Sequence, residues 1–198
     1  MKYGCVLLAG GRGRRMGEVN KAKLEYGHQT FADRITNEMI KTGLPCYISS
    51  AAYEQEVPDG WTPVKDAVTD ASGGYIGPIG GIYSCLRQAK ADGLDGLFFA
   101  PCDAPFFSRE LIEKLAGSID EKTEAVCWRT ADGCIQTTFG WYSVNVLPAL
   151  EKDIKDGKYK LVKSLEKVRC RIISTSSADM DDRIFTNINS EEEYRDLK

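Results

Sequence analysis

A short apolar run that leads directly into a glycine-rich loop constrains the fold more than any other segment. Residues 5–8 read Cys-Val-Leu-Leu, and glycines follow at positions 10, 11, 13 and 17. An apolar run without alternation is typical of a strand that is buried on both faces, as in a parallel sheet. Glycine permits positive φ and a close approach of the backbone to a ligand. The start of the chain therefore predicts a buried strand whose exit contacts a ligand.

Strands and helices are predicted to alternate between residues 2 and 120. Helical spacing of apolar residues predicts helices that begin near Phe31, at Pro78 and after Ser108, the expected N-cap of its helix. Further strands are predicted at 45–50, 61–65 and 97–100. This order is the pattern of an α/β fold with a mainly parallel central sheet. We expect residues 1–198 to form a single domain.

The second half of the chain predicts a hairpin and two shorter helices. Strands are expected at 125–128 and 135–142, joined by a turn at Asp132-Gly133. A helix follows through 147–154, and a late strand covers 170–174. Ser190 and Glu193 have the spacing of a capping box, which predicts a short final helix.

Composition excludes several classes of function. The formal net charge is −3 and the pI is about 5.4, so we expect no nucleic-acid partner. The apolar stretch 5–9 is too short for a membrane span or a signal-peptide core, so we expect a cytoplasmic protein without a membrane partner. Seven cysteines without a Cys-x-x-Cys pair argue against a disulfide framework and a zinc ribbon. The single histidine, His28, is expected to be exposed in a polar turn.

The loop after the first strand concentrates positive charge. It is not a Gly-x-Gly-x-x-Gly motif, because Met16 takes the last position, and no Gly-Lys-Ser/Thr closes a P-loop. Backbone N–H groups of a glycine-rich turn, with arginine and lysine, can nevertheless hold a triphosphate. A solvated basic loop is the alternative interpretation. Glu18 is the one acidic residue in this stretch of sequence. The cationic residues are Arg12, Arg14, Arg15, Lys21 and Lys23.

Two further strand exits carry candidate ligand-binding groups. Asp66 follows the strand at 61–65, and Asp103 follows the strand at 97–100. Ligands bind beyond the carboxyl ends of parallel strands, and Mg²⁺ combines one or two carboxylates with phosphate oxygens. Asp103 is therefore a candidate ligand of Mg²⁺, although an aspartate that orders a turn is the alternative. The segment 77–81, Gly-Pro-Ile-Gly-Gly, opens a helix whose N–H groups can meet an anion or a base, or is a flexible loop.

Taken together, these motifs resemble the molybdenum cofactor guanylyltransferases. The resemblance is carried by the segments 8–11, 15–17 with Lys21, 77–81, 102–106 and 185–189, which occur in the family's order and spacing. It covers residues 5–26, 64–106 and 184–197 and is thin between 107 and 183. It implies a Rossmann-like three-layer nucleotidyltransferase fold with a mainly parallel sheet.

The resemblance also implies an activity and its residues. It implies the transfer of GMP from GTP to the phosphate of molybdenum-molybdopterin, with release of pyrophosphate and with Mg²⁺ as cofactor. The implied catalytic residues are Asp103, which also binds the metal, Arg15 and Lys21. The implied partners are recipient molybdoenzymes or cofactor chaperones, and we expect a monomer. The implied substrate-binding residues are Leu8, Ala9, Gly10, Gly11, Lys21, Asp66, Gly77, Asp103, Asn187 and Asn189.

Departures from the family's pattern concern mainly the acceptor side. Ser50 stands where the family often has asparagine, Thr137-Thr138 where it often has Pro-Thr, and Lys158 and Lys160 where paired arginines are common. One alternative is a related nucleotidyltransferase that uses CTP or UTP on a cofactor or sugar phosphate. Another is a carrier of pterin cofactor, which would bind GTP without releasing pyrophosphate.

Overall fold

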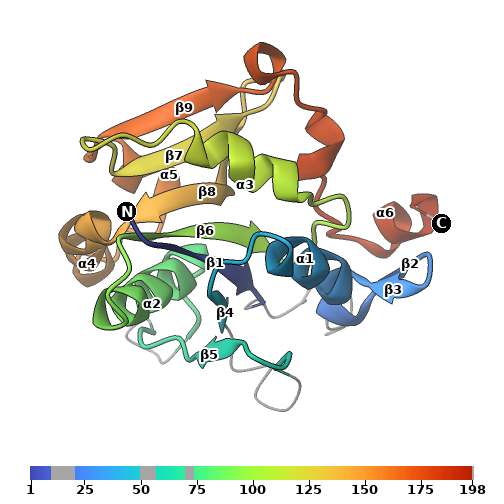
Figure 1. The fold of residues 1–198 in the computed structure, drawn as a ribbon, viewed down its shortest axis with the longest axis horizontal. Helices are drawn as coiled ribbons and strands as arrows, with labels where there is room; N and C mark the ends of the chain where they lie inside the picture. The colour runs from blue at the N-terminus through green and yellow to red at the C-terminus, as the bar shows by residue number, and fades with distance from the viewer. Residues whose placement is uncertain (10–20, 50–56, 70–73, 198) are drawn as a thin grey trace.

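The computed structural model describes residues 1–9, 21–49, 57–69 and 74–197 of the chain. Within these ranges a seven-stranded sheet has the strand order β5-β4-β1-β6-β8-β7-β9, with helices on both faces (Figure 1). Its strands are β1 (Tyr3–Leu8), β4 (Cys46–Ser49), β5 (Thr62–Val64), β6 (Gly96–Pro101), β7 (Ala125–Arg129), β8 (Ile135–Ser143) and β9 (Cys170–Ser174). The helices are α1 (Phe31–Ile40), α2 (Pro78–Ala91), α3 (Arg109–Ala116), α4 (Leu147–Lys155), α5 (Leu161–Leu165) and α6 (Glu191–Asp196).

The central sheet is mainly parallel, as predicted. β1 pairs in parallel with both β4 and β6, and β4 pairs in parallel with β5. β7 and β9 are also parallel, whereas β8 runs antiparallel to both of its neighbours, β6 and β7. The predicted hairpin between β7 and β8 is confirmed, and its turn residue Gly133 has a φ of 87°, which favours glycine.

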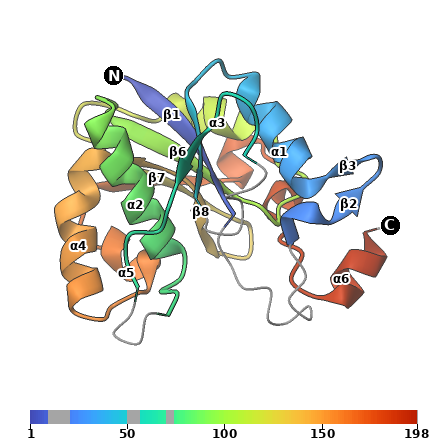
Figure 2. The ribbon, with the colours of Figure 1, turned by 90° about the horizontal axis from the view of Figure 1, so that it is seen from below.

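Two apolar cores lie on opposite faces of the sheet and create the predicted three layers. Figure 2 shows α2, α4 and α5 on one face and α1 and α3 on the other. Val6 and Leu8 of β1 belong to the core under α2, while Cys5 and Leu7 belong to the core under α1. Every residue of β6 is also buried. Burial on both faces explains why these strands show apolar runs instead of alternation.

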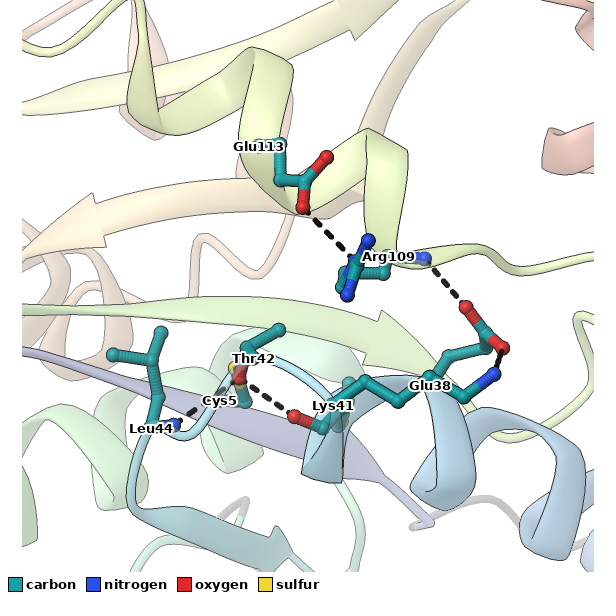
Figure 3. A network of polar contacts seen from close by, with 8 residues as sticks. Cys5, Glu38, Lys41, Thr42, Leu44, Arg109 and Glu113 are labelled. Atoms are coloured by element: carbon teal, nitrogen blue, oxygen red, sulfur yellow. Dashed lines mark hydrogen bonds and ion pairs between the residues drawn. The ribbon is translucent and has the colours of Figure 1, made fainter.

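The start of α3 differs from the prediction. Ser108 is the N-cap residue, but its side chain makes no capping hydrogen bond. The main-chain N–H of Arg109 instead donates to a carboxylate oxygen of Glu38 on α1, at 3.0 Å, as Figure 3 shows. Glu38 also pairs with Lys41, and Arg109 pairs with Glu113 at 2.9 Å. A carboxylate from the neighbouring helix therefore replaces the serine as the cap and ties α1 to α3.

Several short elements were not predicted. A hairpin of β2 (Glu25–Tyr26) and β3 (Gln29–Thr30) precedes α1, and exposed His28 lies in its turn, as expected. Elements of two to five residues, such as these strands and α5, are too short to show periodicity. The 3₁₀ helices η2 (Lys21–Lys23), η4 (Val144–Val146), η5 (Ser176–Ala178) and η6 (Asp182–Phe185) were missed for the same reason.

The cysteines and the helices bear on two expectations from composition. All seven cysteines are free thiols, which agrees with the absence of a disulfide framework. In the described part of the chain, no helix combines the length and apolar character that a bilayer crossing requires.

Gly96 is expected to be essential for the packing of β6. A Cβ at this position would lie 2.5–2.7 Å from ring atoms of Trp141, which is buried. Because the indole has no room to move, Gly96→Ala should lower the free energy of unfolding by about 1–3 kcal/mol.

Urea denaturation would measure this effect. The control is Gly117→Ala, where the atoms nearest to an added Cβ would lie 3.7 Å away and φ is −63°. That substitution should leave stability unchanged or raise it by about 0.4–1 kcal/mol. Equal unfolding midpoints for the two variants would contradict the argument.

Candidate functional site

The exits of three neighbouring strands meet at one edge of the sheet. β4, β1 and β6 are adjacent and parallel, so their carboxyl ends point in the same direction. The N–H of Ala9 donates to the carbonyl of Ser49 at 3.0 Å, and the N–H of Cys102 donates to the carbonyl of Leu8 at 3.1 Å. Main-chain hydrogen bonds therefore hold the three exits together beyond the ends of the strands.

A cluster of three polar side chains lies at this edge. The Nζ atom of Lys21, on η2, lies 3.0 Å from Oδ2 of Asp103 and 2.6 Å from Oδ1 of Asn189. The side chains of Lys21 and Asp103 are each 17% exposed, so the ion pair is partly shielded and still open to a ligand. The N–H of Ile188 also donates to the carbonyl of Asp103 at 3.0 Å. The structure thus brings together residues from the start, middle and end of the chain.

Asn187, which directly precedes Ile188, carries a further side-chain oxygen. Its side-chain oxygen is buried and has no hydrogen-bond partner among the described residues, while its main-chain carbonyl accepts from Asn189 Nδ2 at 3.3 Å. A buried acceptor without a partner is costly, so this oxygen is suited to a cation or to a donor group of a ligand.

The donor set fits a metal that arrives with phosphate. In the described ranges no three His, Cys, Asp or Glu side chains gather closely enough to enclose a metal ion. Mg²⁺ does not need such a cage, because it takes one or two carboxylates and completes its shell with substrate phosphates and water. The carboxylate of Asp103 and the unpartnered oxygen of Asn187 are hard oxygen donors of this kind.

A second group of residues surrounds the start of α2. Ser49 Oγ donates to Asp66 Oδ1 at 2.9 Å, which links the exits of β4 and β5. A Cβ on Gly81 would lie 2.7 Å from Ser49 Oγ and 3.3 Å from Leu8 Cδ2, so only glycine lets α2 approach these exits so closely. Gly77, the N-cap residue of α2, has a φ of 85° and lies directly before Pro78.

The predicted site residues fall into these two groups. Leu8, Ala9, Asp66 and Gly77 lie at the exits of β1 and β5 and at the start of α2, whereas Lys21, Asp103 and Asn189 form the polar cluster beside Asn187. Gly10, Gly11 and Arg15 lie outside the described residues, so their contacts stay predictions.

Ser49 belongs to the second group of residues but was not predicted from the sequence. Ser49 ends an otherwise apolar strand, and a polar residue at such an exit was the available signal. Ser50, where the sequence departs from the family's pattern, lies outside the described residues.

Comparison with known proteins agrees with this arrangement. Residues 5–169 match the MobA-like NTP transferase domain. The chain belongs to this family. It is therefore a nucleotidyltransferase by family, which confirms the enzyme class that the resemblance implied.

Relatives and solved structures extend the agreement over nearly the whole chain. A Vibrio atlanticus protein named molybdenum cofactor guanylyltransferase is 27% identical over 189 residues, which cover 95% of this chain and 91% of that protein. The solved molybdopterin-guanine dinucleotide biosynthesis protein A of Archaeoglobus fulgidus has a TM-score of 0.79 at 20% identity, covering 100% of this chain and 96% of its own. A Mycobacterium tuberculosis protein, solved in complex with manganese, has a TM-score of 0.65 at 20% identity, covering 99% and 97%. At this identity the two structures confirm the fold.

In this MobA-like protein the thiol of Cys102, next to Asp103, is poorly suited to act as a nucleophile. Burial, followed by the neighbouring charge of Asp103, raises the pKa of the Cys102 thiol to about 12. A neutral thiol is a poor nucleophile, which supports the prediction that Cys102 is a packing residue.

Asp66 is expected to reduce stability at neutral pH. Burial raises the pKa of its carboxyl above the ordinary value of 3.8, and the hydrogen bond from Ser49 only partly opposes this. As pH rises from the ordinary pKa through the raised one, the folded state holds a proton that the unfolded state has lost, so stability falls. Asp66→Asn keeps an acceptor for Ser49 without the charge. It should raise the thermal unfolding midpoint at pH 7, and the gain should shrink toward about pH 4.

Thermal scans between about pH 4 and pH 8 would test this sign. Asp59→Asn, an exposed aspartate in the turn before β5, is the control and should show no pH-dependent gain. A lower midpoint for Asp66→Asn at pH 7 would show that the charge stabilises the fold instead.

Proposed function

We propose that this chain transfers GMP from GTP to the phosphate of molybdenum-molybdopterin, forming molybdopterin-guanine dinucleotide cofactor and releasing pyrophosphate. The convergence of Lys21, Asp103 and Asn189 at the strand exits carries the proposal, because it places a cation and a carboxylate where a triphosphate would lie. Support also comes from relatives named molybdenum cofactor guanylyltransferase, which match 95% of the chain.

The reaction needs no nucleophile from the protein. An oxygen of the acceptor phosphate attacks the α-phosphorus of GTP, and the bond to the bridging oxygen breaks as pyrophosphate leaves. The described residues agree with this, because His28 is exposed in the β2–β3 turn and the thiol of Cys102 is neutral. Catalysis then consists of positioning the two phosphates and offsetting their charge.

Lys21 and Asp103 would have different roles toward the phosphates. We propose that Asp103 holds Mg²⁺ and that the buried oxygen of Asn187 is a further candidate ligand. When bound, the ion would polarise the α-phosphate. Lys21 would offset charge on the departing pyrophosphate, together with Arg15 from outside the described residues. The ammonium of Lys21 is already placed by Asp103 and Asn189, so little reorganisation is needed when the nucleotide arrives.

The second group of residues would hold the nucleoside. The carboxylate of Asp66, oriented by Ser49, accepts hydrogen bonds and suits donor groups of ribose or base. The main chain of Leu8, Ala9, Gly10 and Gly11 and the segment from Gly77 to Gly81 would contact the remaining parts of the nucleotide. At Gly81 the absence of a side chain lets the start of α2 lie directly against Ser49 and Leu8, which keeps this segment close to Asp66.

The whole chain would act as one domain. Asn187 and Asn189 follow residue 169, where the family match ends, yet Asn189 contacts Lys21 and Ile188 contacts Asp103. We therefore propose that residues 1–198 form a single nucleotidyltransferase domain. A monomeric state, a cytoplasmic location and recipient molybdoenzymes or cofactor chaperones as partners stay predictions.

Nucleotide choice is the direct test of the proposal. With Mg²⁺ present, GTP should raise the thermal unfolding midpoint more than CTP or UTP. Pyrophosphate should be released when molybdenum-molybdopterin is added with GTP. Stabilisation and turnover with CTP or UTP in place of GTP would favour the alternative nucleotidyltransferase. GTP binding without pyrophosphate release would favour a carrier of pterin cofactor.

Asp103 is expected to be required for turnover. Asp103→Ala removes the proposed metal ligand and the anionic partner of Lys21, so the rate of pyrophosphate release should fall on the order of 100- to 1,000-fold. The fold should remain intact, because the ion pair is partly exposed.

A matched control lies at the opposite end of the same strand. Asp95 directly precedes β6, is exposed and accepts a hydrogen bond from the N–H of Lys2 at 2.6 Å. Asp95→Ala should keep turnover at the wild-type rate. Wild-type turnover by Asp103→Ala would remove Asp103 from the catalytic site.

A further inference from the structure

The C-terminal helix α6 lies on the surface of the protein. None of its residues is buried. In both ribbon views it lies beside the β2–β3 hairpin (Figures 1 and 2). Tyr194 supplies hydrogen bonds and a ring contact there: its hydroxyl donates to the carbonyl of Glu25 at 2.9 Å and accepts from the N–H of Glu25 at 3.1 Å. Its ring also meets buried Phe31 edge-on, with centroids 6.1 Å apart.

The same helix fixes Asn189. A carboxylate oxygen of Glu193 accepts from the N–H of Asn189 at 2.5 Å and from the N–H of Ser190 at 3.0 Å. The Ser190 hydroxyl accepts in turn from the N–H of Glu193, which completes the capping box. The orientation of Asn189 therefore depends on where α6 begins, and the position of α6 depends on Tyr194.

These contacts form a closed chain of interactions that begins and ends at the segment containing Lys21. Glu25 lies four residues after Lys21 on the same short stretch of chain, and Tyr194 binds its backbone. From Tyr194 this chain of interactions continues through α6 to Asn189, whose oxygen accepts from the Lys21 ammonium at 2.6 Å. A shift of α6 would change the distance between Asn189 and Lys21, while Ile188, one residue earlier, remains bonded to the carbonyl of Asp103.

We propose that Tyr194 is a positioning residue, which anchors α6 on Glu25 and Phe31 so that Asn189 holds the ammonium of Lys21 beside Asp103. The consequence for catalysis rests on the proposed function, whereas the geometric role of Tyr194 does not. The anchor explains how an exposed asparagine at the end of the chain keeps a defined place in the site.

Tyr194→Phe tests the anchor, because it removes both hydrogen bonds to Glu25 and keeps the ring on Phe31. The readout is the rate at which acetic anhydride labels Lys21 in the full-length protein, followed by mass spectrometry. We expect labelling about tenfold faster than in the wild type, the factor for a typical coupling between contacting residues. Tyr47→Phe is the matched control: it removes a phenolic hydrogen bond to Asp92 at the other end of the sheet and should leave labelling unchanged.

A double-variant comparison separates positioning from a general loss of structure. Asn189→Ala should raise the labelling of Lys21 to the same extent as Tyr194→Phe. The double variant should show no further rise, because both changes act through one contact. Wild-type labelling of Lys21 in Tyr194→Phe, or multiplied effects in the double variant, would overturn the proposal.

Turnover provides the second measurement. In Tyr194→Phe the kcat for pyrophosphate release from GTP should fall by about the same factor as labelling rises, while KM changes little. Unchanged kcat with faster labelling would overturn the positioning role in catalysis. Failure of the wild type to release pyrophosphate from any nucleoside triphosphate would instead refute the proposed function, and the labelling result alone would then decide the role of Tyr194.

Discussion

The parallel pairing of β1 with β4 on one side and β6 on the other determines where this protein can do chemistry. Because all three strands point the same way and are buried on both faces, their first polar residues emerge at one edge of the sheet. Main-chain hydrogen bonds from Ala9 to Ser49 and from Cys102 to Leu8 continue the pairing beyond the strands. The candidate site thus lies at the ends of strands that are buried on both faces.

The site combines a fixed half with a half that is assembled from distant segments. Ser49 and Asp66 hydrogen-bond across adjacent strand exits, and glycines at the start of α2 allow that helix to approach them. Lys21 and Asn189, in contrast, come from a 3₁₀ turn and from the C-terminal segment. Their geometry depends on hydrogen bonds in place of burial, which leaves the ammonium accessible to a nucleotide.

Two polar groups at the candidate site are costly to the folded protein. Asp66 keeps a carboxylate whose pKa burial raises, and Asn187 keeps a buried oxygen without a partner among the described residues. Such groups are costly in an otherwise well-packed α/β protein, and a ligand that supplies donors or a cation would offset the cost. In a chain of net charge −3, the local cation at Lys21 marks where a triphosphate is expected to lie.

Local signals made the framework predictable. Apolar runs identified β1 and β6, Pro78 marked the start of α2, and Ser190 with Glu193 formed the capping box, because each signal involves neighbours in the chain. Asp66, Asp103 and Lys21 could be chosen as candidates since each follows a strand or a loop of recognisable type.

Only the tertiary structure decided which of these residues meet. The capping of α3 by Glu38, the antiparallel pairing of β8 with β6 and the contact of Lys21 with Asn189 join segments far apart in sequence. No local pattern encodes such distances, because they depend on the path of the whole chain around the sheet. The sequence by itself determined the elements and their polar ends, and the packing of those elements determined the site.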